Sequence, residues 1–167
     1  MDSRSEAEFA EFMRGRWPAL VRLGYGLTGD EGLAEDLARA ALAKAYASWP
    51  RVLRAGDPDV YLRRIILNAS LGKVRRRRGR ERRRGDEPEP ETAQLARADD
   101  DRPALVKALM QLPVGQRSVV LLRYWMDMTE AQVAAVLGCS VGSVRSQASR
   151  ALANLRVGED VAEEVLL

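Results

Sequence analysis

The sequence contains no histidine, and its one cysteine is Cys139. An intrachain disulfide is therefore impossible, and so are a zinc site of cysteine and histidine, a serine–histidine triad and a cysteine–histidine nucleophile. A glycine-rich phosphate-binding loop is missing as well. These absences exclude much of ordinary enzyme chemistry, so we expect a binding protein with no catalytic residue, no metal and no cofactor.

Long apolar segments are also lacking. No stretch approaches the roughly 18 consecutive apolar residues that a membrane-spanning helix requires. The first residues, MDSRSEAEFAEFM, do not contain the apolar core of an export signal. We therefore expect a cytoplasmic protein without a membrane partner. The 167 residues, 46% hydrophobic and 31% charged, suffice for one ordinary domain or two small ones and argue against wholesale disorder.

The formal net charge of +3 is distributed unevenly along the chain. Residues 73–84, here called the basic block, hold nine basic residues and one acidic residue. Cations at this density repel one another unless a polyanion neutralises them, so nucleic acid is the favoured partner. A solvated basic helix end or a disordered tract is the alternative. A membrane surface is disfavoured, because no hydrophobic face or lipidation site accompanies the block.

Residues 85–101 form a break in composition. They hold seven acidic residues and one basic residue, with two prolines and few apolar side chains, as is typical of an extended linker that repels itself. The linker separates an N-terminal module, residues 1–84, from a C-terminal module, residues 102–157, and a tail of residues 158–167 is expected to fray. Because the periodic segments all predict helices, we expect an all-α fold of two small helical domains joined by a flexible acidic linker.

The N-terminal module shows apolar residues at three- and four-residue spacing. A second helix, about residues 33–49 and capped by Thr28 or Asp30, carries two apolar stripes, so it lies in the interior of a bundle or presents one stripe to a partner. Residues 50–56 are expected to form a loop, and Asp57 with Pro58 predicts the start of a third helix. The expected buried residues are Phe9, Phe12, Met13, Leu20, Leu23 and Leu27 in the first helix and Leu62, Ile65, Ile66 and Ala69 in the third.

The C-terminal module predicts a helix-turn-helix after two helices at about 103–111 and 114–126. Thr129 and Gln132 have the spacing of a capping box that starts a helix ending at Leu137. Gly138 can adopt the left-handed conformation that ends this helix, and Ser140 can cap the next one. That last helix is expected to bury Val141, Val144, Ala148, Leu152 and Leu155.

The opposite side of the last helix carries short or hydrogen-bonding side chains and no acid. A solvated structural helix usually mixes Glu with Lys, whereas short side chains let a helix enter a major groove and Arg or Gln can contact base edges or phosphates. This pattern predicts a DNA-recognition helix whose contacting residues are Ser143, Arg145, Ser146, Gln147, Ser149 and Arg150.

The segment LPVGQRSVVLLRYWMDMTEAQVAAVLGCSVGSVRSQASRALANLR resembles region 4 of the sigma-70 superfamily, in its extracytoplasmic-function group (group IV). The segments TGDEGLAEDLARAALAKAYASW and YLRRIILNASLGKVRRRR resemble region 2 of the same group. The Ser-Gln-Ala-Ser after Arg145 is similar to the actinobacterial sigma-E-like subgroup. The resemblance covers most of the chain apart from the linker and both ends.

The resemblance implies a sigma factor that binds core RNA polymerase and directs promoter recognition and transcription initiation. The N-terminal module would recognise and melt the −10 element, and the helix-turn-helix would recognise the −35 element. The helix at 114–126 would help seat the C-terminal module on the polymerase flap, and an anti-sigma factor is a possible partner. By the same resemblance, the residues that dock on the polymerase clamp would be Glu35, Asp36, Leu37, Arg39 and Leu42, and those that contact the −10 element would be Trp49, Arg51, Asn68, Lys73, Arg75 and Arg76.

Other functions stay open at this point. An autonomous helix-turn-helix regulator would bind its site without polymerase, and a degenerate sigma factor would sequester polymerase without initiating. Gly72, Lys73 and Val74 stand where many family members carry Asp or an aromatic pair, so altered −10 preference or weak melting is a further alternative.

The basic block generates the first testable prediction. Removing four of its arginines should flatten the salt dependence of DNA binding by roughly 0.9 units of log–log slope for each lost phosphate contact. The measurement is a series of binding constants at increasing salt concentration. An unchanged slope would show that the block does not contact phosphates.

Overall fold

The computed structural model describes residues 2–85 and 102–157, with the side chains of 73–84 and 156–157 left out of the description. The predicted linker, apart from Gly85, and the predicted tail therefore lie outside the described residues. Every regular element in the described ranges is helical, and no strand occurs there. The all-α prediction is confirmed.

Helices α1 (Ser3–Thr28) and α2 (Glu31–Ala47) form an antiparallel pair whose ends are set by local hydrogen bonds. The carboxylate of Asp2 accepts the backbone N–H of Ser5 at 2.8 Å, and this bond lowers the pKa of Asp2. Helix α1 ends at Thr28 and is followed by the capping residue Gly29, which has a φ of 69°. Asp30 then caps α2 by accepting the N–H of Leu33 at 2.9 Å, so Asp30 is the predicted cap that forms.

Helix α2 is buried along both of its apolar stripes. Leu37 and Leu42 are 2% and 4% exposed, and Ala38 and Ala41 between them are fully buried. Leu33 and Tyr46, at the outer edges of the stripes, are exposed. Of the two alternatives for this helix, the structure therefore supports the bundle interior.

The segment after α2 corrects the sequence-based prediction of a loop at residues 50–56. Residues Trp49–Arg54 form a short helix, α3, in which Pro50 occupies the first turn, where a proline costs no hydrogen bond. Trp49 and Val52 fix α3 to the core because both are buried. The predicted loop is therefore wrong for residues 50–54, where proline starts a helical turn.

Helix α4 (Pro58–Arg84) begins where predicted and continues through the basic block. The carboxylate of Asp57 accepts the backbone N–H of Asp59 at 2.9 Å. The carboxylate of Asp59 forms an ion pair with the guanidinium of Arg16 in α1 at 2.6 Å, and this contact raises the pKa of Arg16. The inner face of α4 is built on Leu62 and Ile66 as expected. Leu67 is also buried, whereas Ile65 and Ala69 are only half-buried.

The C-terminal module consists of α6 (Ala104–Met110), α7 (Val114–Val120), the π-helical turn η1 (Leu121–Trp125), α8 (Glu130–Leu137) and α9 (Val141–Val157). The capping box is confirmed in both directions: Thr129 accepts the Gln132 N–H at 3.1 Å, and the Gln132 side chain accepts the Thr129 N–H at 2.8 Å. Gly138 is left-handed with a φ of 68°. Ser140 caps α9 by accepting the Ser143 N–H at 3.1 Å.

The predicted helix at 114–126 is divided, because its last turn is wound as a π-helix. The N–H of Met126 reaches the carbonyl of Leu121 at 2.9 Å, a five-residue step. Asp127 then takes a positive φ of 53°, and the side chain of Arg123 donates to the carbonyl of Met128 at 3.0 Å. This wider turn redirects the chain into α8.

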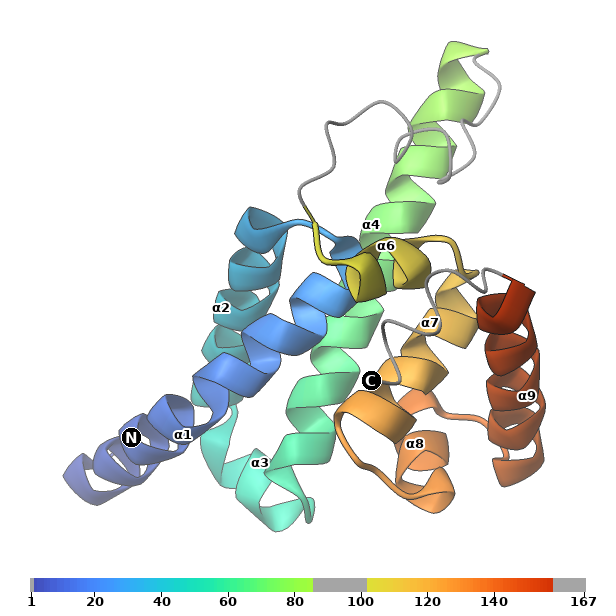
Figure 1. Cartoon of the computed structure of the whole chain (residues 1–167). Helices are drawn as coiled ribbons and strands as arrows, with labels where there is room; N and C mark the ends of the chain where they lie inside the picture. The colour runs from blue at the N-terminus through green and yellow to red at the C-terminus, as the bar shows by residue number, and fades with distance from the viewer. Residues whose placement is uncertain (1, 86–101, 158–167) are drawn as a thin grey trace.

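The two modules pack against each other around one continuous hydrophobic core. Helices α6 and α7 lie beside α1 and α8 lies beside α4, while the C-terminal part of α4 extends beyond the other helices (Figure 1). Arg64 of α4 donates to the carbonyl of Ala135 in α8 at 2.5 Å, and α1 approaches η1 closely at Gly26. The sequence predicts the helices of each module but not this contact between modules.

The crossing of α1 and α2 generates a stability prediction. A Cβ at Gly24 would lie 2.9 Å from the backbone Cα of Ala34, so Gly24→Ala should destabilise the fold by about 1–3 kcal/mol although alanine favours helix. Gly15→Ala in the same helix is the matched control, because nothing lies within 4 Å of its added Cβ, and it should stabilise by up to about 1 kcal/mol. Denaturant unfolding measures both. Equal midpoints for the two variants would contradict the close crossing.

Candidate functional site

The predicted recognition helix, α9, is held by α7 and α8 and leaves one side open to solvent. Val144 and Ala151 anchor its inner side and are fully buried, and Val141, Ala148, Leu152 and Leu155 are half-buried beside them. Five of the six predicted DNA contacts are exposed and Gln147 is half-buried; the exposed ones are Ser143, Arg145, Ser146, Ser149 and Arg150.

The six predicted DNA contacts differ in direction and in the contacts that they make within the chain. At about 100° per residue, Ser146 and Arg150 point away from the buried stripe, whereas Arg145 and Gln147 lie at opposite edges. Arg145 forms a 2.5 Å ion pair with Glu130, the first residue of α8. The Gln147 amide nitrogen lies toward Gly115 of α7, 3.9 Å from where a Cβ would stand. The centre of the exposed surface is thus formed by Ser146 and Arg150.

Trp49, predicted to contact the −10 element, is instead a core residue. It is 2% exposed and lies against Phe9 and Phe12, with ring centroids 5.1 Å away in each case. Its indole N–H is buried and has no acceptor among the described residues, which costs about 1–3 kcal/mol. Aromatic packing against α1 offsets that cost and encloses the ring in the core.

The other predicted −10 residues are differently placed. Arg51 of α3 and Asn68 of α4 are exposed. Lys73, Arg75 and Arg76 belong to the helical backbone of α4, but their side chains lie outside the described part of the chain. The described candidate contacts on this side of the N-terminal module are therefore Arg51 and Asn68.

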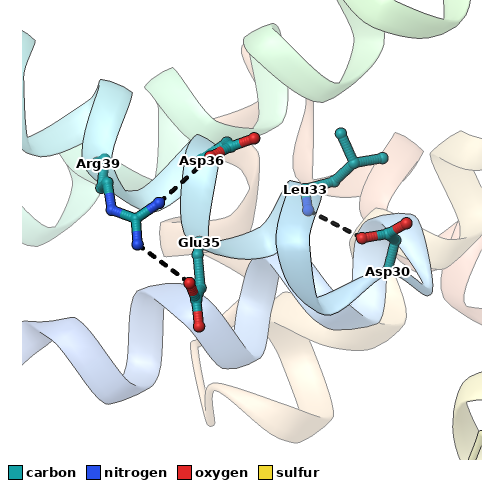
Figure 2. A network of polar contacts seen from close by, with 5 residues as sticks. All are labelled: Asp30, Leu33, Glu35, Asp36 and Arg39. Atoms are coloured by element: carbon teal, nitrogen blue, oxygen red, sulfur yellow. Dashed lines mark hydrogen bonds and ion pairs between the residues drawn. The ribbon is translucent and has the colours of Figure 1, made fainter.

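The predicted clamp-docking residues of α2 separate into two groups. Figure 2 shows that Glu35, Asp36 and Arg39 lie together on the outer surface of the helix. The guanidinium of Arg39 reaches Glu35 at 3.0 Å and Asp36 at 3.3 Å, and it also lies 5.8 Å from the Trp17 ring of α1. The group is a compact polar surface with both signs of charge.

Leu37 and Leu42 correct the prediction that they face a partner. Both belong to the core that α2 shares with the surrounding helices, so the docking hypothesis for them is not supported by the structure. A helix with two apolar stripes can bury both when helices flank it on two sides, as α1 and α4 do here.

The apolar surface of α7 and η1, predicted to seat on the polymerase flap, is also covered within the chain. Val119, Leu121 and Leu122 are buried, and Leu121 packs against Gly26 of α1. Tyr124 is the large exposed hydrophobic residue of η1.

Arg117 is a buried residue that sequence reasoning missed. It is 2% exposed and donates to the carbonyls of Leu27, Leu109, Met110 and Leu112. From sequence alone, an arginine in a helix is expected at the surface, and only the apolar residues Val119 and Val120 that follow it suggest a buried position.

Within residues 2–85 and 102–157, no group of His, Cys, Asp or Glu side chains could hold a metal ion. None of the helices in these ranges has the length and apolar character that a membrane span requires.

Comparison with known proteins places both modules in one family. The Sigma-70 region 2 family matches residues 15–80, and the Sigma-70 region 4 family matches residues 102–155. The RNA polymerase sigma-E factor of Streptomyces antibioticus is 38% identical over 89% of this chain and 83% of that protein. The ECF RNA polymerase sigma factor SigC of Mycobacterium tuberculosis is 30% identical over 73% of this chain and 68% of that protein.

Solved structures agree with the family matches over both modules. The sigma factor RpoE of Bartonella quintana, solved with the anti-sigma factor NepR, aligns with a TM-score of 0.73 at 25% identity over 93% of this chain and 97% of that one. CnrH, solved with the cytosolic domain of CnrY, aligns with a TM-score of 0.63 over 93% of this chain. The matched Streptomyces, Mycobacterium and Bartonella proteins are sigma factors, which are not enzymes. The chain belongs to the sigma-70 family, within its extracytoplasmic-function sigma factors.

Proposed function

We propose that this chain binds core RNA polymerase and directs it to promoters, with α9 recognising the −35 element and the N-terminal module recognising and melting the −10 element. The observation that carries the proposal is the exposed, acid-free side of α9, held in a helix-turn-helix within a chain whose two modules match sigma regions 2 and 4. A helix of this kind fits the major groove and can contact base edges.

Within α9, we assign the central contacts to Ser146 and Arg150. Arg150 is exposed and makes no ion pair with any residue that the structure describes, so its guanidinium is available for a base edge or a phosphate. To contact DNA, Arg145 must either keep its ion pair with Glu130 at the same time or break it. Ser143 and Ser149 complete the exposed surface, and Gln147 contributes from its edge nearest α7.

We assign contact with the −10 element to helices α3 and α4. Arg51 and Asn68 are exposed on these helices, and the basic block continues α4 with a net charge of +8. Strand separation needs no hydrolysis, because captured bases and phosphate contacts supply the free energy. Lys73, Arg75 and Arg76 remain proposed contacts from the block.

Polymerase binding is assigned to the outer surface of α2. Glu35, Asp36 and Arg39 present both signs of charge there, which suits specific electrostatic matching with a partner surface. The covered surface of α7 and η1 is the proposed flap contact. We expect catalysis, with its metal ions, to come from polymerase, so that this chain is not an enzyme and works in the cytoplasm where polymerase is found.

An anti-sigma factor is a further proposed partner. The aligned sigma factor RpoE was solved with the anti-sigma factor NepR, and CnrH was solved with the cytosolic domain of CnrY; each alignment covers 93% of this chain. The match extends across both modules, so a partner that binds both at once would find them in a comparable arrangement.

Transcription in vitro tests the proposed function. The purified chain with core polymerase should produce promoter-specific transcripts, and core polymerase alone should not. Promoter binding without any association with polymerase would instead indicate an autonomous regulator. Association without transcripts would indicate a sequestering protein.

The recognition helix generates a binding prediction. Arg150→Ala should weaken binding to a duplex carrying only the −35 element by about 1–3 kcal/mol if it contacts a base and by less if it contacts a phosphate. Arg145→Ala should cost less, because its guanidinium already contacts Glu130. Fluorescence anisotropy measures the affinities, with Arg22→Ala, an exposed arginine of α1, as the control for lost charge. If both α9 variants bind as the control does, α9 is not the recognition helix.

A further inference from the structure

The first residue of α8, Glu130, lies beside the recognition helix and contacts one of its arginines. The Glu130 carboxylate accepts the Nε–H of Arg145 at 2.5 Å. The capping box of Thr129 and Gln132 fixes the helix end that carries Glu130. The side chain of Glu130 is 34% exposed, whereas that of Arg145 is 70% exposed. The acid is therefore the anchored partner, and the arginine is the one that reaches into solvent.

This ion pair uses Nε and leaves the outer end of the guanidinium open. Within residues 2–85 and 102–157, neither terminal nitrogen of Arg145 has a hydrogen-bond partner. Arginine recognises guanine by donating from two nitrogens to N7 and O6 of the base. Because Glu130 occupies Nε, the Nη1 and Nη2 groups stay available for that contact. The hydrogen bond to Glu130 also restrains rotation of the planar guanidinium, so the direction of the fork is set in advance.

The charge of Glu130 opposes the other contact that Arg145 could make. Most hydrogen bonds between proteins and DNA go to phosphate and sugar, so an arginine at the edge of a recognition helix is drawn to the nearest phosphate. The ion pair with Glu130 cancels the charge of Arg145, and the carboxylate repels a phosphate that approaches the same place. Base contact is thereby favoured over backbone contact.

Stability of the fold does not explain this ion pair. Exposed ion pairs contribute little to the free energy of unfolding, because water screens them and ordering two side chains costs entropy. An acid in the first turn of α8 is also favourable by itself, next to the positive end of the helix dipole. We therefore look for the effect of the pair in DNA binding rather than in folding.

We propose that Glu130 is a positioning residue that directs Arg145 to one guanine of the −35 element and away from the DNA backbone. The inference rests on the proposed function, in which α9 enters the major groove. Arg145 then contributes to the choice of sequence more than to total affinity, which agrees with the small affinity loss expected for Arg145→Ala. Glu130 acts through the arginine and needs no DNA contact of its own.

Glu130→Ala in the full chain tests this role. The probe is a pool of DNA duplexes with a randomised −35 segment, from which bound sequences are selected; affinities are then measured with each base pair changed in turn. The unsubstituted chain should select a guanine that Arg145→Ala no longer selects. Glu130→Ala should lower the preference for that guanine roughly tenfold. It should also steepen the log–log salt dependence by about 0.9, because the released Arg145 gains a phosphate contact.

Glu31→Ala is the matched control, because Glu31 is also the first residue of a helix capped by a side chain, α2, and its loss changes the net charge equally. This control should keep the guanine preference and the salt slope of the unsubstituted chain. In the Arg145→Ala background, Glu130→Ala should change the base preference no further, as expected if the acid acts through the arginine.

Two results would overturn the positioning role: a Glu130→Ala chain that keeps its full guanine preference, or one that loses affinity for every sequence alike, as a merely structural residue would. Repeating the selection and transcription with core polymerase separates this inference from the proposed function. Guanine selection without transcripts would contradict the proposed function and leave the positioning role standing. Transcripts from a site at which no base depends on Arg145 would do the reverse. Selection of no sequence in either form would overturn both.

Discussion

The arrangement of the two modules depends on how the C-terminal end of α1 is satisfied. Arg117 is buried and hydrogen-bonded to carbonyls from both modules, and the core continues without a break across the place where it lies. Hydrophobic burial alone would tolerate many relative orientations of two helical bodies, because it has no direction. Directed hydrogen bonds from a planar guanidinium to fixed carbonyls select one of them.

This constraint explains why some functional surfaces are covered and others are not. The elements that support α9 are the same ones that contact the N-terminal module, α7 and η1 toward α1 and α8 toward α4. Helix α9 lies on the far side of these supporting helices, so its polar side faces solvent while the modules are packed together. The contact between the modules therefore leaves the polar side of α9 uncovered.

Local signals in the sequence predicted the helix ends and the helix-turn-helix well. The predicted caps form as expected because each contacts only residues close to it in sequence: Asp30, Asp57 with Pro58, the Thr129–Gln132 box and Gly138. The incorrect predictions concern residues that are buried by contacts with distant parts of the chain. Nothing within a few residues of Trp49 shows that Phe9 and Phe12 surround it, and neither stripe of α2 reveals that helices flank both sides. Arg117 was missed for the same reason, since its acceptor at Leu27 is ninety residues away.

Helix α4 links the packed core to the proposed −10 contacts. Its first half is fixed by Leu62 and Ile66 and by the ion pair of Asp59 with Arg16, while its second half carries the nine basic residues of the block. Gly72 lies where these halves meet, and glycine inside a helix costs about 1 kcal/mol relative to alanine. Repulsion within the block opposes helix there, and phosphates would remove that repulsion. The cost of Gly72 and the repulsion within the block act on one continuous helix. Nucleic acid bound by the block would therefore stabilise the second half of α4, which joins the bound phosphates to the core.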